Sequence, residues 1–352
     1  MAGAAVTEDR AKREPGMPYA PSWVNVLATW FERLPGPTWA AYAGAMAVGI
    51  GLPILSIGEF SPVGGTFATV YYGALPFGVL GLIHLLDDTA GRALGTLRPL
   101  LRTDDAGVAA AHYRLTVAPA RPAALIALFA SVLTAWGYAA DPIGSGIVGM
   151  SPQALAFRYA WESLITASFM VLAYHSIRQL RLIVRIHDDI ERIDIFDQGP
   201  LYAFSQLTSR TALGLIVLLA PSLFLLPTFA EVSTIALTAS WYGASVLIAV
   251  AAFVLPLRGM HARLAAEKRR HQGEIGRRIS ASLRSIQEAV DAGDVPTIEA
   301  RNKSLAALVA ARDLVHRTPT WPWSSGALTG FASAIVLPIA LFLIQRMLAQ
   351  VV

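Results

Sequence analysis

Long apolar stretches recur along the chain, and they constrain its fold more than any other feature. The stretches lie at residues 38–57, 66–86, 123–140, from about 159, 211–227, 232–255 and 325–348. Each is close to the roughly 20 apolar residues that an α-helix needs to cross the hydrocarbon core of a bilayer. Because 55% of the residues are hydrophobic and only 15% are charged, the chain is predicted to be an all-α, polytopic membrane protein with seven transmembrane helices.

The distribution of basic residues supports this count, because cytosolic loops of membrane proteins are enriched in Lys and Arg. If the seven stretches alternate across the membrane, all 28 Lys and Arg residues except Arg158 and Arg346 fall on one side. That side is predicted to be the cytosol, so the N-terminus lies inside and the C-terminus outside. The net charge of +4 then belongs to cytosolic loops and does not indicate a nucleic-acid partner.

The chain divides into four predicted regions. Residues 1–37 are expected to form a disordered tail and an amphipathic helix at the membrane interface, because the helix at 22–34 is too short to cross. Residues 38–257 form a six-span membrane domain, in which the fourth span continues into the cytosol. Residues 258–320 form a cytosolic helical hairpin, and residues 321–352 contain the seventh span.

The hairpin is predicted from two apolar stripes at helical spacing. The first helix carries Ile275, Ile279, Leu283, Ile286 and Val290, and the returning helix carries Ile298, Leu305, Leu308, Val309 and Val315. Gly293 and Asp294 between them favour a helix end followed by a new helix start. Neither stripe has anything else to bury against unless other helices or subunits supply it. The hairpin is therefore interpreted as a device for coupling or assembly, with these anchor residues: Ile275, Ile279, Leu283, Ile286, Leu305 and Leu308.

The last apolar stretch carries small residues at spacings of four, namely Gly326, Gly330, Ala334 and Pro338. One interpretation is close packing of helices through small residues. The other is a pore lining, in which one such helix from each subunit surrounds an axis and a hydrophobic constriction gates by excluding water. The gate residues would be Val336, Ile339 and Leu343. Both interpretations can hold together, one on each face of the helix.

Acidic residues predominate on the predicted outer side. Glu59, Glu162 and Glu231 are assigned to an outer mouth that would favour cations. Glu162 is the one acid inside a predicted span, and two interpretations stay open for it. It is either a functional ionisable group at membrane depth or a side chain that reaches the interface from the end of its helix.

Signatures of enzymes are absent from the sequence: it contains no His-Glu-x-x-His, no Gly-x-Ser-x-Gly, no P-loop and no dinucleotide-binding glycine turn. No catalytic residue, cofactor or metal site is predicted, and the chain contains no cysteine. The acidic run at 188, 191 and 194 could offer oxygen ligands to a divalent cation, but a solvated helix face is the preferred interpretation. His84, Asp87 and Asp88, at the predicted end of span two, are interpreted as an interfacial cap.

This architecture resembles the superfamily of insect odorant and gustatory receptors. The shared features are seven spans with a cytosolic N-terminus, a helix before span one, cytosolic extensions of spans four and six, and a cytosolic helix leading into span seven. The family's short seventh-span motif is matched in part by the apolar run that ends at Gln345. The resemblance implies a tetrameric, ligand-gated cation channel, in which cytosolic extensions anchor the subunits and the seventh helix, with Gln345, lines the pore.

The function expected from the sequence is therefore an oligomeric cation channel, a homotetramer in a lipid bilayer that conducts monovalent or divalent cations. The alternative is a signalling or scaffold protein that recruits cytosolic partners through its hairpin. A secondary transporter is less favoured, because no Gly- or Pro-broken span recurs in two halves. Usage rich in Ala, Gly and Arg but poor in Lys is typical of a GC-rich prokaryote, which places the protein in the plasma (inner) membrane.

Overall fold

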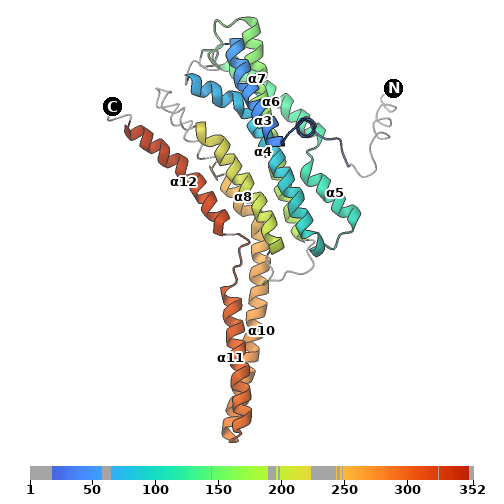
Figure 1. Cartoon of the computed structure of the whole chain (residues 1–352), viewed down its shortest axis with the longest axis vertical. Coiled ribbons are helices and arrows are strands. Elements are labelled where there is room, and N and C mark those ends of the chain that lie inside the picture. The colour runs from blue at the N-terminus through green and yellow to red at the C-terminus, as the bar shows by residue number, and fades with distance from the viewer. Residues whose placement is uncertain are drawn as a thin grey trace.

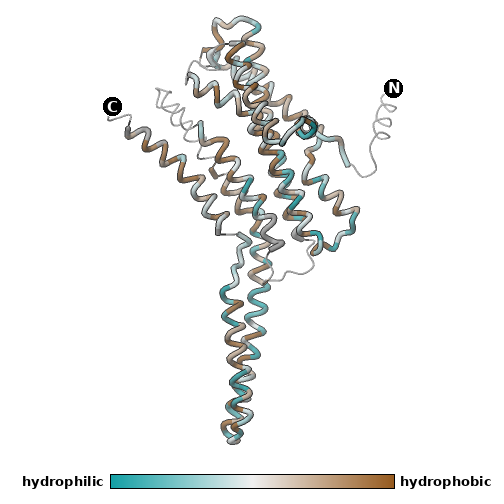
Figure 2. Tube along the Cα trace, viewed as in Figure 1, coloured by the Kyte–Doolittle hydropathy of each residue, from teal (hydrophilic) through white to brown (hydrophobic). Residues whose placement is uncertain are grey.

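The computed structural model describes residues 18–57, 65–143, 145–188, 196, 199–222, 243, 246–247, 249–323 and 325–348. Every regular element within these residues is an α-helix or a short 3-10 turn, so the predicted all-α class is confirmed. Most of the helices form a bundle, and two of them form a stalk that projects from one end of it (Figure 1). Apolar residues run along the bundle helices, whereas polar residues are frequent on the stalk (Figure 2).

The short helix expected before the first span is present as α2 (Trp23–Glu32). The Ser22 hydroxyl caps it by accepting a hydrogen bond from the backbone N–H of Asn25, which satisfies a donor that a helix start leaves unpaired. Val24 and Phe31 on its apolar face are buried against the core of the bundle. Protein contacts therefore hold α2 in place, and its position at a membrane interface stays a prediction.

The helices α3 (Thr38–Ile57) and α4 (Gly65–Leu97) pack side by side. Their backbones approach closely at Gly49 and Gly73, where a Cβ on either residue would lie 2.4–2.7 Å from the other's carbonyl oxygen. The helix is longer than the apolar stretch at 66–86, because α4 continues to Leu97. The continuation is stabilised by a buried stripe at helical spacing, formed by Leu86, Ala90, Ala93, Leu94 and Leu97.

A 3-10 turn at Arg98–Leu100 leads to α5 (Asp105–Thr116), and α6 (Ala120–Ala140) follows. The N-terminal segment crosses the connection between these two helices. The backbone N–H of Ser22 donates to the carbonyl of Ala118, and the N–H of Ala120 donates to the carbonyl of Ala20, both at 2.9 Å. This pairing fixes the start of α2 against the start of α6.

The longest helix is α7 (Pro152–Asp188), which packs on α6 and α4, and α8 (Gly199–Leu219) lies against α4. Gly199 and Pro200 are the first two residues of α8. Proline is tolerated there because the first turn of a helix has no acceptor for its missing N–H. The predicted span at 211–227 is thus part of a helix that begins earlier, and most of the span at 232–255 lies outside the described residues.

The stalk is the predicted helical hairpin, formed by α10 (Arg258–Asp291) and α11 (Val295–Arg317). Gly293 has a φ of +67°, a conformation that glycine adopts without steric cost. The Asp294 carboxylate caps α11 by accepting from the backbone N–H of Thr297 at 3.2 Å and from its hydroxyl at 2.5 Å. These hydrogen bonds lower the pKa of Asp294.

The final helix, α12 (Ser325–Leu348), has the bounds that the sequence predicts, and it packs against α8. The two indoles before it stack on other rings of the protein. Trp321 lies 4.1 Å from the His261 ring, and Trp323 lies 5.1 Å from the Phe253 ring, between ring centroids. This aromatic stack joins the start of α12 to the base of the stalk.

Within the part of the chain that the structure describes, three helices are long and apolar enough to cross a membrane, namely Thr38–Ser56, Thr66–Leu100 and Ala120–Ala140. A shorter apolar helix covers Gly326–Leu341. These helices indicate a membrane-associated protein, in agreement with the predicted class. Because α4 has 33 residues, it is roughly 50 Å long at 1.5 Å per residue. Its charged last third, beyond Leu86, therefore extends past a hydrocarbon core of about 30 Å.

Candidate functional site

The predicted gate residues lie together on the uncovered side of α12. On its inner side, Phe331 is buried and stacks on Phe253 with ring centroids 4.4 Å apart. Val336, Ile339 and Leu343 are 61%, 39% and 53% exposed. One subunit therefore covers one face of α12 and leaves the predicted gate face free.

The small residues of α12 lie in two different environments. Ala334 packs against the cluster formed with α8, and Pro338 is half-buried. At Gly326 and Gly330, by contrast, no described atom lies within 4 Å of the place where a Cβ would stand. The two glycines therefore leave an unfilled surface at the start of the helix.

Two of the three predicted outer-mouth residues, Glu59 and Glu231, lie outside the described residues, and so does the side chain of the predicted pore residue Gln345. Glu162 is placed, and it is paired with a neighbour on its own helix. Its carboxylate accepts a hydrogen bond of 2.9 Å from Nε of Arg158, which is itself 9% exposed and also donates to the Gly146 carbonyl. The pair is neutral, so Glu162 adds no net negative charge to a mouth.

The predicted anchor residues do not all share one surface of the stalk. Five of them are half-buried: Ile275, Ile279, Ile286, Leu305 and Leu308. Leu283 is 45% exposed, and the neighbouring Val290 is 57% exposed. The stripe on α10 therefore serves two surfaces, one that closes the hairpin and one that points away from it.

A buried polar cluster between α4 and α7 was missed by sequence reasoning. Oδ1 of Asp87 accepts hydrogen bonds from Nε2 of His175 at 2.6 Å and from Nε2 of Gln179 at 2.7 Å. His175 and Gln179 are 0% and 1% exposed, and the Asp87 side chain is 13% exposed. Gln179 also donates to the Leu115 carbonyl at 2.8 Å. The cluster thus connects α4, α5 and α7 through one carboxylate.

A second polar chain reaches α4 one turn earlier. Nε2 of His84 lies 3.5 Å from a Glu32 carboxylate oxygen, and its Nδ1 lies 3.4 Å from the Tyr42 hydroxyl. The Tyr42 ring packs on Phe31, with centroids 4.6 Å apart. His84 therefore joins α2 and α3 to the face of α4 that also carries Asp87.

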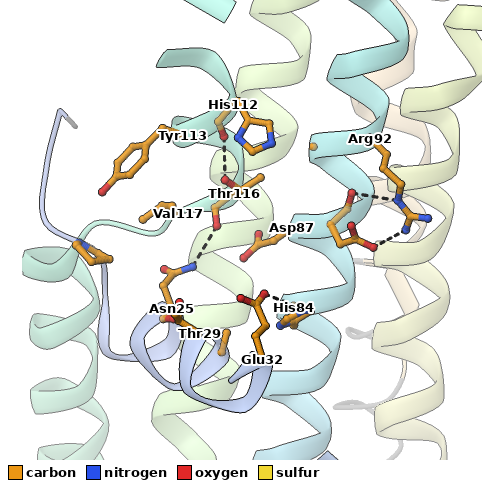
Figure 3. Close-up of a pocket in the computed structure, with 14 residues that line it drawn as sticks. Asn25, Thr29, Glu32, His84, Asp87, Arg92, His112, Tyr113, Thr116 and Val117 are labelled. Atoms are coloured by element: carbon orange, nitrogen blue, oxygen red, sulfur yellow. Dashed lines mark hydrogen bonds and ion pairs between the residues drawn. The ribbon is translucent and has the colours of Figure 1, made fainter. Parts of the chain in front are cut away.

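These two polar groups border an open pocket of about 580 Å³ between α2, α4 and α5. Glu32 and Asn25 line it from α2, His84 and Asp87 from α4, and Thr116 from α5 (Figure 3). The Asn25 side-chain amide donates to the Thr116 carbonyl at 3.1 Å and so closes one side of the pocket. Chemically, the arrangement can hold a positive charge or pass a proton between Asp87 and His175.

The sequence contains part of the signal for this cluster. His84, Asp87 and Asp88 stand at helical spacing on α4, and His175 and Gln179 stand four residues apart on α7. The first three were interpreted as an interfacial cap, which was wrong for Asp87. Because α4 continues past Asp87 and α7 covers it, this carboxylate lies inside the protein.

No protein-family model, curated protein or solved structure matches the chain. Within the part of the chain that the structure describes, no group of three or more His, Cys, Asp or Glu side chains is arranged to hold a metal ion. The acidic run at 188–194 lies almost wholly outside that part.

Proposed function

We propose that the chain is one subunit of an oligomeric cation channel, a homotetramer in which α12 lines the pore. The observation that carries the proposal is the position of α12 at the edge of the bundle (Figure 1), with its gate face exposed. Gly326 and Gly330 are also unfilled, and small residues let helices in a membrane approach closely. In the assembly, the two glycines contact a neighbouring subunit, and Val336 and Leu343 face the axis.

The proposal includes seven membrane crossings, with the N-terminus in the cytosol and the C-terminus outside. The distribution of Lys and Arg residues supports this orientation. Two charged residues in the first part of α7, Arg158 and Glu162, are paired with each other. A paired group is far less costly at membrane depth than two isolated charges.

The stalk supports the oligomeric part of the proposal. A two-helix hairpin buries little apolar area by itself, and Leu283 and Val290 remain exposed on it. Stalks from four subunits can cover these side chains by packing together. The cation preference rests on Glu59 and Glu231, because Glu162 is neutralised by Arg158.

A signalling or scaffold protein is the second candidate function. The exposed apolar side chains of the stalk favour it, because a cytosolic partner could cover Leu283, Val290, Val295 or Leu314. The two candidates differ in stoichiometry and in conduction. A scaffold needs no oligomer and carries no current.

The proposal is tested by mass and by current. The detergent-purified protein should have the mass of a tetramer, and Val336→Ser or Leu343→Ser should produce leak currents in planar bilayers. Polar side chains at a hydrophobic constriction stabilise a continuous column of water. The matched control is Leu128→Ser on α6, where the exposed leucine should tolerate serine without current. A monomeric mass, or serine variants that are silent in an intact oligomer, would exclude the channel.

A further inference from the structure

The pocket between α2, α4 and α5 has no role in the proposed channel. Its lining residues belong to α2, α4, α5 and the segments next to them, and none belongs to α8, the stalk or α12. Its volume of about 580 Å³ is within the range of roughly 300–1,000 Å³ that small-molecule sites occupy. The pocket is therefore large enough for an organic molecule.

The charges around the pocket are predominantly negative. Asp88 is neutralised by Arg92, whose guanidinium lies 2.7 Å from its carboxylate. Among the described residues, the ionic partner of Glu32 is the His84 ring, at the longer distance of 3.5 Å. The two hydrogen bonds from α7 to Asp87 both end on Oδ1, which leaves Oδ2 for the pocket. Two carboxylates, Glu32 and Asp87, are thus available to a ligand (Figure 3).

The Asp87 carboxylate is held in one position before any ligand arrives. His175 and Gln179 are buried and fix its inner oxygen. A carboxylate that is already oriented loses little conformational entropy on binding. Because it is also largely shielded from water, its attraction for a positive charge is screened less than that of a surface carboxylate.

The opposite wall of the pocket is formed by rings. His112 lies over α4 at Gly91, where a Cβ would stand 2.8 Å from its Nε2. Tyr113 follows it in α5 and also lines the pocket. The absence of a side chain at Gly91 therefore allows the His112 ring to lie at the edge of the cavity. These rings offer a flat surface to the carbon skeleton of a ligand.

We propose that this pocket binds a small organic cation, of the class of protonated primary amines. The ammonium group donates hydrogen bonds to Oδ2 of Asp87 and to the Glu32 carboxylate, because charge-assisted bonds of this kind are the strongest available there. The carbon skeleton lies against His112 and Tyr113. An anionic ligand would lie beside the carboxylates of Glu32 and Asp87, and an inorganic ion would leave most of the volume unfilled.

The experiment uses the purified full-length protein in detergent and isothermal titration calorimetry. The probe is 2-phenylethylamine, and its neutral counterpart 2-phenylethanol has the same skeleton without the charge. We expect saturable binding of the amine that weakens as salt is added, and at least about tenfold weaker binding of the alcohol. Equal binding of the two probes, or no saturable binding of the amine, overturns the proposal.

Three variants locate the binding. Asp87→Asn keeps the shape of the side chain and should weaken amine binding about tenfold or more, because it removes the buried charge. Glu32→Gln changes a largely exposed side chain, so folding is preserved, and it should weaken binding by a factor of about three. Asp105→Asn, at an exposed carboxylate of α5 outside the pocket, should leave binding unchanged. The assignment to this pocket is overturned if both Glu32→Gln and Asp87→Asn bind the amine with wild-type affinity. It is also overturned if Asp105→Asn weakens binding as much as Asp87→Asn does.

Discussion

Replacing Asp87 by alanine removes the one acceptor shared by two buried donors. The hydrogen bonds of 2.6 Å from His175 and 2.7 Å from Gln179 both end on this carboxylate. Gln179 keeps a second acceptor, the Leu115 carbonyl at 2.8 Å. His175 would have no hydrogen-bond partner left among the described residues, because its other ring nitrogen, Nδ1, is buried without one. The cost of the substitution therefore falls mainly on His175.

The magnitude follows from that geometry. A buried polar group left without its partner costs about 1–3 kcal/mol, and removing one member of a buried ion pair costs about 3–5 kcal/mol. We expect Asp87→Ala to lower the free energy of unfolding by about 3 kcal/mol. Adding His175→Phe removes the unpaired imidazole, so the double variant should be less destabilised than the sum of the single ones, by about 1–2 kcal/mol.

The assay is equilibrium unfolding of the detergent-purified protein in SDS, followed by far-UV circular dichroism. Asp88→Ala is the matched control, because it is the next residue in α4 and its pair with Arg92 is more than half exposed. An exposed pair contributes less than about 1 kcal/mol. If Asp87→Ala costs no more than Asp88→Ala, or if the double-variant cycle shows no coupling, the buried cluster does not stabilise the bundle as argued.

Three further predictions concern assembly, topology and pH. Leu283→Asp combined with Val290→Asp should reduce the mass of the detergent-purified protein to that of a monomer, because carboxylates are costly in an apolar contact; an unchanged mass would show that the stalk does not assemble subunits. A tag after Val352 should be accessible from outside the cell and a tag in the turn at 291–296 should not; accessibility of both from one side would contradict the orientation. The pKa of Asp294 is lowered by its capping hydrogen bonds. Its contribution to stability is therefore present above the pKa of the unfolded carboxyl, near 4, and is lost as the pH falls through the folded pKa. Amide exchange in the first turn of α11 should accordingly accelerate only in acid.

Local signals in the sequence predicted the elements that local chemistry determines. The hairpin turn followed from Gly293 and Asp294, which favour one helix end and one helix start. The bounds of α12 were predicted from the apolar stretch at 325–348. The apolar stretches at 66–86 and 211–227 did not predict the full length of their helices. The helix α4 continues to Leu97, and α8 already begins at Gly199. Tertiary packing extends α4, and Pro200 is compatible with a first helical turn.

Contacts between distant segments account for what the sequence could not predict about the candidate sites. Asp87 and His175 are 88 positions apart, and neither spacing nor composition reveals that α4 and α7 bring them together. The same holds for α12, whose apolar residues look alike in the sequence. Only the packing of Phe331 on α8 and Phe253 distinguishes its covered face from the face that carries Val336 and Leu343.

The contacts of α7 also indicate which part of the bundle can move. Trp161 donates to the Tyr72 carbonyl at 3.1 Å near one end of its contact with α4, and His175 bonds to Asp87 near the other. These two attachments are roughly 21 Å apart along the helix, at 1.5 Å per residue, so α4 and α7 form a frame that resists both sliding and rotation. The packing of α12 on the bundle is apolar and aromatic where Phe331 and Ala334 meet α8 and Phe253. Apolar packing of that kind permits small rotations at low cost, whereas breaking a buried hydrogen bond does not. A movement that opens a pore should therefore occur in α12 and leave α4 and α7 in place.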